Sequence, residues 1–460
     1  MFIQCSNLIT ANPPQLNCGI TVADIDGDGQ FELIVAGYKG PNRVLKWDGQ
    51  ALVDATPPIL ADPDRSTISI GCADVDGDGR EEIYVLNSDS YGGPKQVMDR
   101  LLACFGKRWL DLLSLPENYA AANRLSGRSV GCIDRRGTGR YGFVVASFGG
   151  PLRLYELDAR GRLVDAAEEA GIDADASARS LLCLPIVGER PDILVGCELG
   201  PNLLFRNAGD GGFEEIAGPW GIADARNQAR GAAALDADGD GLFDLALGNW
   251  EGPHRLFLQR PGGGFADQAP PEMSLPSRVR TVIAADFDND GYEELFFNNL
   301  GEPNRLFAWR DERWQQVDIG DAAEPQGLGT GAAVADIDGD GMLELLISHG
   351  ESSPQPLSLY LAMPNGNNWL RVMPLTRGGA PARGAVVRLT AGGRTQMRAI
   401  DAGSGYLCQM EPVAHFGLGE LSRVERVEVR WPDGAQLRLD NPQPCRTLVV
   451  RHPEGGGLAG

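Results

Sequence analysis

Five short acidic segments carry the side chains whose type and spacing suit the binding of a metal ion. The first, Asp24-Ile25-Asp26-Gly27-Asp28-Gly29-Gln30-Phe31-Glu32, has carboxylates at positions 1, 3, 5 and 9. Calcium is a hard cation that takes about six to eight oxygen ligands, which a loop wrapped around the ion can supply. Gly29 at position 6 permits the sharp bend, and the carbonyl of Gln30 at position 7 would add a backbone oxygen. The pattern predicts a calcium site in this loop.

The same arrangement of four carboxylates and one backbone carbonyl occurs in four further segments. The predicted ligands are Asp24, Asp26, Asp28, Gln30 and Glu32; Asp74, Asp76, Asp78, Arg80 and Glu82; Asp236, Asp238, Asp240, Leu242 and Asp244; Asp286, Asp288, Asp290, Tyr292 and Glu294; and Asp336, Asp338, Asp340, Met342 and Glu344. We expect about five calcium ions from this set, and the sequence leaves open whether monovalent cations bind as well.

These segments are not EF-hand loops, although they begin in the same way. An EF-hand needs a bidentate glutamate at position 12 and helices on both sides. Position 12 is instead apolar in every segment, where it is Val35, Val85, Leu247, Phe297 or Ile347. Simple acidic turns are the other alternative, but four carboxylates in one short loop repel one another at neutral pH unless a cation lies between them.

The acidic segments belong to a repeat of about fifty residues. Their first aspartates lie 50 residues apart, except for one gap of 162 residues between Asp74 and Asp236. That gap holds two copies that have lost the acidic pattern, one at Asp134 and one aligned on Leu184. Because Arg136 stands where a carboxylate belongs, we expect no calcium in the first of these, and none near Leu184. The chain therefore contains seven repeat units.

Each unit reads as four short strands, and this predicts an all-β, seven-bladed β-propeller over residues 1–364. A run of small residues precedes the acidic loop, a β-rich stretch such as FELIVAG follows it, and two shorter strands complete the unit. Small residues suit inner strands because the blades crowd together at the axis. Phe2 lies 22 residues before Asp24, as Leu52 lies before Asp74, so Phe2-Ile3-Gln4-Cys5 is predicted to be the outer strand that closes the seventh blade.

Residues 365–452 predict a small C-terminal β-sandwich, followed by a flexible tail at 453–460. Strands are expected at 385–390, 395–400, 427–431 and 436–439, joined in part by the turns 391–393 and 432–434. The apolar segment 403–410 either packs on its own domain or inserts against the propeller, where Tyr406, Leu407 and Cys408 would plug the channel. The chain from Asn365 onward carries a net charge of +4, whereas the residues before it carry −26.

Composition excludes several kinds of partner. The formal charge of −22 argues against nucleic acid as a partner, and no apolar run is long enough to insert into a membrane.

Nine cysteines form no CxxC pair, and Cys72 and Cys132 are expected to be buried thiols. We expect a monomer. The N-terminus shows no signal peptide, so a cytoplasmic location is predicted from the sequence as written.

No catalytic residue and no organic cofactor site are predicted. The four histidines, His254, His349, His415 and His452, form no metal-protease spacing, and the sequence contains no nucleophile elbow or Walker loop. His415 is expected to be structural. The alternative of an enzyme with an active site at the channel mouth, assembled from several blades, stays open at this point.

The acidic loops resemble the FG-GAP/VCBS repeats of integrin-type propellers, and Gly403 to Gly419 (GSGYLCQMEPVAHFGLG) resembles the ASPIC/UnbV domain. Their order resembles the cartilage acidic protein family, here in a short form without an EGF-like module. The resemblance implies calcium bound at loop positions 1, 3, 5, 7 and 9, and a non-enzymatic scaffold for protein or glycan binding and adhesion. It also implies an extracellular location, whereas an intracellular interaction scaffold is the alternative.

Overall fold

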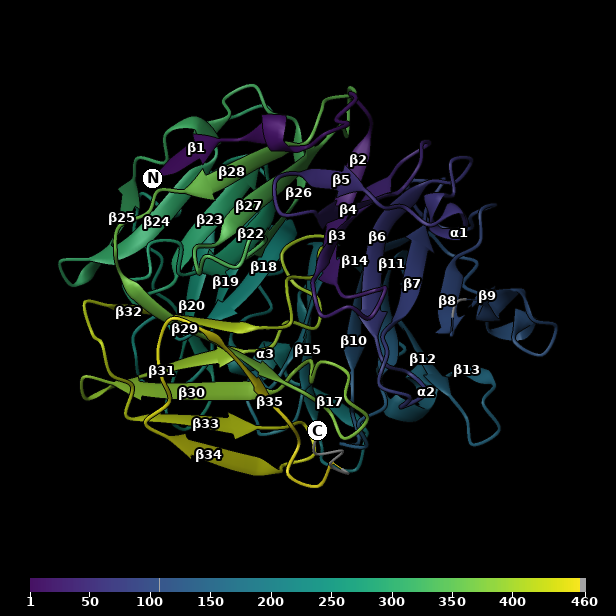
Figure 1. Cartoon of the computed structure of the whole chain (residues 1–460). Coiled ribbons are helices and arrows are strands. Elements are labelled where there is room, and N and C mark those ends of the chain that lie inside the picture. Colours follow the sequence, from purple (N-terminus) through teal and green to yellow (C-terminus); the bar gives the residue numbers. More distant parts are fainter. Residues whose placement is uncertain (107, 456–460) are drawn as a thin grey trace.

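The computed structural model describes residues 1–106 and 108–455, and its regular structure is almost entirely strands, as predicted. Figure 1 shows the C-terminal strands, coloured yellow-green, packed on one side of the strands that come from the rest of the chain. The helices are single turns: α1 (Pro58–Ala61), α2 (Ala167–Ala170), α3 (Ala217–Trp220), η1 (Ser6–Leu8), η2 (Leu112–Ser114), η3 (Tyr119–Ala121) and η4 (Asp321–Ala323). Within the described residues, no helix has the length and apolar character needed to cross a bilayer.

The repeat units fold as four-stranded antiparallel meanders. The first two units are β2 (Asn17–Ala23), β3 (Glu32–Gly37), β4 (Arg43–Trp47) and β5 (Leu52–Asp54), then β6 (Thr67–Ala73), β7 (Glu82–Asn87), β8 (Arg100–Phe105) and β9 (Arg108–Asp111). The next two are β10 (Gly127–Ile133), β11 (Gly142–Pro151), β12 (Arg153–Leu157) and β13 (Leu163–Asp165), then β14 (Asp175–Leu184), β15 (Asp192–Leu199), β16 (Leu203–Asn207) and β17 (Phe213–Glu215).

The remaining units follow the same order of strands. They are β18 (Ala229–Leu235), β19 (Asp244–Asn249), β20 (Arg255–Gln259) and β21 (Phe265–Asp267), then β22 (Val279–Ala285), β23 (Glu294–Asn299), β24 (Arg305–Arg310) and β25 (Arg313–Val317), and finally β26 (Gly329–Ala335), β27 (Glu344–His349) and β28 (Ser358–Ala362) with β1 (Phe2–Gln4). β1 pairs with β28, with Phe2 opposite Ala362, so both ends of this region share one sheet.

Two units share a single eight-stranded sheet, which the repeat pattern did not predict. β11 and β14 are each ten residues long and continue past their own units. There Phe148 pairs with Ser177 and Pro151 pairs with Asp175, with a register shift between Phe148 and Gly150. These are the two units without the acidic pattern.

Close contact between neighbouring units explains the small residues of the inner strands. A Cβ added at Gly231 in β18 would lie 2.5 Å from the backbone nitrogen of Val282 in the next inner strand, β22. The second strand of each unit is buried on both faces, as all six residues of β3 show, because other units or strands cover each side. Cys72 and Cys132 are buried on inner strands, as expected.

The C-terminal domain consists of two sheets. One contains β31 (Arg394–Ala399), β30 (Val386–Ala391), β33 (Arg426–Arg430) and β34 (Gln436–Asp440), and the other contains β32 (Ala414–Gly419), β29 (Asn368–Pro374) and β35 (Thr447–Val450). The first sheet holds the four predicted strands within about a residue of their expected ends. A sandwich implies a second sheet, but its strands β29, β32 and β35 were not located from the sequence. Of the expected tail, residues 456–460 lie outside the described residues.

Residues 402–410 insert among the inner strands of the repeat units, so the alternative in which they pack only on their own domain is wrong. The backbone N–H groups of Val22, Cys132 and Ala232 donate to the carbonyls of Gln409, Ala402 and Gly405, at 2.9, 2.7 and 2.8 Å. Ser69 Oγ donates to the carbonyl of Leu407 at 3.0 Å. Four inner strands, β2, β6, β10 and β18, therefore hold this segment, which we call the plug.

Candidate metal centres

Each acidic loop folds around its own first aspartate. In the first loop the N–H groups of Gly27 and Gly29 donate to the two carboxylate oxygens of Asp24, at 2.7 and 2.8 Å. The N–H of Ile25 donates to Glu32 Oε2 at 2.9 Å, which draws position 9 back towards position 1. Local hydrogen bonds of this kind compete well with regular structure for aspartate. They hold the carboxylates on one side of the loop.

This pattern is repeated in all five loops. The position 6 N–H donates to the position 1 aspartate at 2.8–3.2 Å. The position 2 N–H donates to the position 9 acid at 2.7–2.9 Å. The position 7 residue is predicted to ligate through its backbone carbonyl. Its N–H donates to the position 5 aspartate at 2.7–2.9 Å. The carbonyls of Gln30, Arg80, Leu242, Tyr292 and Met342 remain predicted ligands.

The turn requires left-handed backbone at two positions. Gly29 has φ +86° and Gly27 has φ +78°, a region that favours glycine because it has no Cβ. Asn289 replaces the position 4 glycine in one loop and still has φ +57°, which asparagine tolerates better than most residues. The loop shape therefore survives this sequence difference.

Three carboxylates in each loop come close enough to share one ion, with ligand oxygens all within 4.8 Å of one another. The groups are Asp24, Asp26 and Glu32; Asp74, Asp76 and Asp78; Asp236, Asp238 and Asp244; Asp286, Asp288 and Asp290; and Asp336, Asp338 and Glu344. The fourth predicted carboxylate of each loop lies outside its group: Asp28, Glu82, Asp240, Glu294 and Asp340.

The donor set fits a hard cation. Asp236 Oδ1, Glu294 Oε1 and Asp336 Oδ1 are buried and have no hydrogen-bond partner in the described part of the chain. A buried carboxylate oxygen without a partner is costly, and a cation at these positions would remove that cost. Since all side-chain donors are carboxylate oxygens, the loops suit calcium rather than zinc, which prefers sulfur and nitrogen ligands.

Burial also raises the pKa of several of these acids. It raises the pKa of Asp74 to about 6 and that of Glu82 to about 9, against the effect of backbone hydrogen bonds that lower both values. Burial likewise raises the pKa of Asp244 to about 7 and that of Glu344 to about 9. Burial away from water and repulsion by the neighbouring carboxylates both disfavour the charged form of these acids. A bound cation would favour the charged form again.

The first loop differs from the others because Lys46 lies among its carboxylates. Lys46 Nζ is 2.8 Å from both Asp28 Oδ2 and Glu32 Oε1, and it also contacts Asp26. Burial alone would lower the pKa of Lys46, but these three hydrogen bonds outweigh it and raise that pKa. An ammonium group therefore occupies the place in this loop where an ion would be expected. The sequence analysis did not identify Lys46 as a neighbour of this loop. Lys46 follows Leu45, and Leu45 pairs with Leu33 in β3, the strand that begins at Glu32 of the loop.

The unit at Asp134 keeps the turn but not the acids. Gly139 N–H still donates to Asp134 Oδ2 at 2.6 Å. Arg135 Nε donates to Glu156 Oε1 at 2.7 Å, and Arg136 contacts Glu169. The two arginines of this loop thus pair with glutamates from outside it.

The C-terminal domain contacts several of the acidic loops. Gly417 N–H donates to Asp286 Oδ2 at 2.9 Å, and Arg371 Nη1 donates to Asp336 Oδ2 at 2.8 Å. His415 Nε2 is 2.6 Å from Asn289 Oδ1. Burial, followed by the nearby Arg371 and Arg398, lowers the pKa of His415 well below its ordinary value, so the ring is neutral. A structural role for His415 stays a prediction, which its burial and its contact with Asn289 favour.

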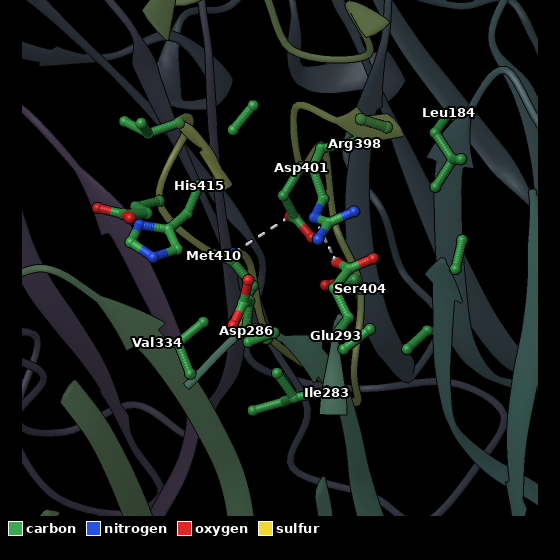
Figure 2. Close-up of a pocket in the computed structure, with 18 of the residues that line it drawn as sticks. Leu184, Ile283, Asp286, Glu293, Val334, Arg398, Asp401, Ser404, Met410 and His415 are labelled. Atoms are coloured by element: carbon green, nitrogen blue, oxygen red, sulfur yellow. Dashed lines mark hydrogen bonds and ion pairs between the residues drawn. The ribbon is translucent and has the colours of Figure 1, made fainter. Parts of the chain in front are cut away.

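A cavity of about 110 Å³ lies at this junction. Figure 2 shows Asp286 and His415 on one side of it, with Glu293 and Arg398 facing them. Arg398 Nε is 3.3 Å from Glu293 Oε1, and Met410 N–H donates to Asp401 Oδ1 at 3.1 Å. The cavity is therefore lined by acids from the repeat units and by residues from the C-terminal domain. No local sequence signal predicts this combination.

Comparison with known families agrees with both parts of this fold. Residues 376–457 match the family described as ASPIC and UnbV. Residues 21–85, 189–247, 236–297 and 286–347 match the FG-GAP-like repeat. The chain is thus a β-propeller of FG-GAP repeats followed by an ASPIC/UnbV domain.

Relatives that match almost the whole of this chain narrow the family assignment. Cartilage acidic protein 1 of Xenopus tropicalis is 47% identical over 463 residues, which cover 92% of this chain and 71% of that protein. Cartilage acidic protein 1 of Homo sapiens is 46% identical and that of Mus musculus is also 46% identical, each over 93% of this chain and over 70% and 72% of those proteins. The chain belongs to the cartilage acidic protein 1 family, and the resemblance seen in the sequence is confirmed.

Proposed function

We propose that this protein is a calcium-binding, non-enzymatic propeller scaffold that binds a protein or glycan ligand. The observation that carries the proposal is the recurrence of three converging carboxylates, with oxygens within 4.8 Å, at the same place in five repeat units. A single acidic turn would be weak support, whereas five equivalent ones at equal spacing favour a common ligand. Hard oxygen donors in a flexible loop are the ligands that calcium prefers.

Two of the loops contact the C-terminal domain, so calcium bound there would stabilise the junction between the two domains. Asp286 and Asp336 each use one oxygen to bind the C-terminal domain and have other acids of their loops beside them. A bound ion would neutralise those acids and hold both contacts in place. A site at tenfold its Kd adds about 1.4 kcal/mol, so five such sites would add about 7 kcal/mol to the free energy of unfolding.

A non-enzymatic role is supported by the surroundings of the histidines. All four are buried, and each has a hydrogen-bond partner within the structure: Ser277 for His254, Glu324 for His349, Asn289 for His415 and Asp433 for His452. The name of the relatives, cartilage acidic protein 1, also refers to no reaction.

The ligand-binding part of the proposal can be tested with immobilised glycan and matrix-protein arrays. The calcium-loaded chain should bind a defined subset of spots, and excess EDTA should abolish that binding. A variant with Asp338→Ala should bind more weakly, whereas Thr138→Ala, in a unit without the acid set, should bind like the wild type. Binding that is indifferent to EDTA, or turnover of an arrayed substrate, would contradict the proposal.

A further inference from the structure

Four consecutive repeat units each place an arginine at the same point of the inner strand. Arg128, Arg179, Arg230 and Arg280 lie in β10, β14, β18 and β22, separated by 51, 51 and 50 residues. Each occupies the register shift near the start of its strand. All four are buried, with only 4–8% of their surface exposed. We call this group the arginine cluster.

The arginine cluster lies away from the acidic loops. The loops follow the ends of the inner strands, whereas the arginines lie near the starts, so the two sets are at opposite ends of these strands. The plug reaches the cluster, since the Arg280 guanidinium is 5.9 Å from the centroid of the Tyr406 ring. Tyr406 therefore forms one wall of the site.

Aromatic rings orient the guanidinium groups. Arg179 lies 4.6 Å from the Phe148 ring centroid, and Arg280 lies 4.1 Å from that of Trp250. Stacking of this kind fixes the plane of a guanidinium but leaves its N–H groups free to bind an oxyanion.

Acidic partners neutralise only part of the charge. Glu198 pairs with Arg179 and with Arg230, whose Nη2 is 2.9 Å from Glu198 Oε1, and Glu351 pairs with Arg280. Four guanidinium groups and two carboxylates leave a net charge of +2. In the described part of the chain, Arg128 has no carboxylate partner; it donates to Ser88 Oγ at 3.1 Å and to the carbonyl of Tyr91.

Several buried N–H groups of the cluster also lack acceptors. Arg128 Nε, Arg280 Nε and both Nε and Nη1 of Arg230 have no hydrogen-bond partner in the described residues. Burial, and then the neighbouring Arg179, lowers the pKa of Arg128. Buried charged donors are costly when they are left without acceptors. The cluster is therefore incomplete as a purely structural network.

We propose that the arginine cluster is a binding site for one doubly charged oxyanion group, a sulfate or a phosphate. Such a group has the charge that neutralises the site and several oxygens that can accept from more than one guanidinium. The net charge of −22 on the whole chain repels long polyanions, so the site takes a single anion or one terminal group. The proposal is independent of the calcium loops and of the ligand proposed above.

Isothermal titration calorimetry on calcium-saturated protein tests this site. Sodium sulfate and sodium phosphate are titrated separately, each against sodium chloride at matched ionic strength. The wild type should bind one sulfate or one phosphate per chain, and Arg128→Gln and Arg230→Gln should each lose at least about tenfold in affinity, or about 1.4 kcal/mol. Arg206→Gln is the control, because the Arg206 side chain is 45% exposed and pairs with Glu214 at the surface.

Each outcome decides the proposal. Absence of saturable binding of both anions to the wild type overturns it, and so does equal binding by wild type, Arg128→Gln and Arg206→Gln. Should Arg230→Gln fail to fold because Glu198 loses a partner, Arg128→Gln decides alone, since Arg128 pairs with no carboxylate of the described residues. The relative affinities for sulfate and phosphate then show which group the site prefers.

Discussion

Arg383 and Glu81 form a fully buried ion pair that joins the C-terminal domain to the second acidic loop. Arg383 Nε donates to Glu81 Oε1 at 2.6 Å, and its Nη2 donates to the carbonyl of Val22 at 3.2 Å. Tyr141 Oη donates to the carbonyl of Arg383 at 2.8 Å. One residue, through its side chain and its backbone carbonyl, thereby ties the C-terminal domain to three different repeat units.

Arg383→Ala should lower the free energy of unfolding by about 3–5 kcal/mol, because it leaves Glu81 buried without a partner. Denaturant titration measures this, with Arg438→Ala as the control. Arg438 pairs with Asp440 at the surface, where the loss should be at most about 1 kcal/mol. The double variant Arg383→Met/Glu81→Gln should lose less than the sum of the single changes. Equal small losses for Arg383→Ala and Arg438→Ala would contradict this account.

His254 should make the fold sensitive to acid. Its Nδ1 accepts from Asn249 N–H at 3.0 Å, as asparagine does at the equivalent positions 42, 202 and 304. Burial, with a smaller effect of Arg305, lowers the pKa of His254 to about 3. Below about pH 6.5 the unfolded chain gains a proton that the folded chain does not, so stability falls as the pH drops towards 3.

His254→Asn should keep the N–H acceptor and remove this dependence. The slope of stability against pH between 6.5 and about 3 should flatten by up to about 1.4 kcal/mol per pH unit, while stability above pH 7 changes little. Denaturant titrations at several pH values measure the slope. Parallel curves for the wild type and His254→Asn would show that His254 is not responsible.

Lys46 should weaken calcium binding at the first loop. Because its ammonium group lies 2.8 Å from two of the loop carboxylates, an incoming ion must displace it. Lys46→Ala should tighten the weakest calcium site by about tenfold to a hundredfold in a calorimetric calcium titration. Arg206→Ala is the matched control, since Arg206 has the corresponding strand position in a unit without an acid set. Unchanged binding in Lys46→Ala would contradict a competition.

Cys408 should be unreactive as long as the plug stays inserted. Its side chain is 2% exposed, and burial raises the pKa of the thiol to about 11, whereas Cys445 is exposed. Thiolate is the reactive form, so both factors slow alkylation. Peptide mapping after alkylation of the calcium-loaded protein should find Cys445 labelled and Cys408 unlabelled. Rapid labelling of Cys408 would show that the plug leaves the inner strands.

The features that recur with the repeat could be predicted from the sequence. The five acidic loops could be located because their ligands and glycines are local and follow a fixed spacing. The arginine cluster carries a similar signal in the near-equal spacing of Arg128, Arg179, Arg230 and Arg280, which a search confined to acidic motifs passes over.

Features that depend on strand register or distant contacts could not be predicted. Lys46 reaches the first loop only because Leu33 pairs with Leu45, which brings the next residues, Glu32 and Lys46, together. Arg383 and Glu81 are 302 residues apart, with no local sign of their contact. In the C-terminal domain, β29 pairs in parallel with β35, with Arg371 opposite Thr447, and such distant pairing leaves no short-range pattern.

Counting bound ions by native mass spectrometry tests the central claim most directly. The calcium-loaded wild type should carry five calcium ions, one for each group of converging acids. The Asp338→Ala variant should carry four ions. The Thr138→Ala variant should carry five, because the repeat unit of Thr138 keeps the turn around Asp134 but lacks the set of four carboxylates. A wild-type chain without bound calcium, or an ion lost from Thr138→Ala and retained by Asp338→Ala, would contradict the assignment of these loops as calcium sites.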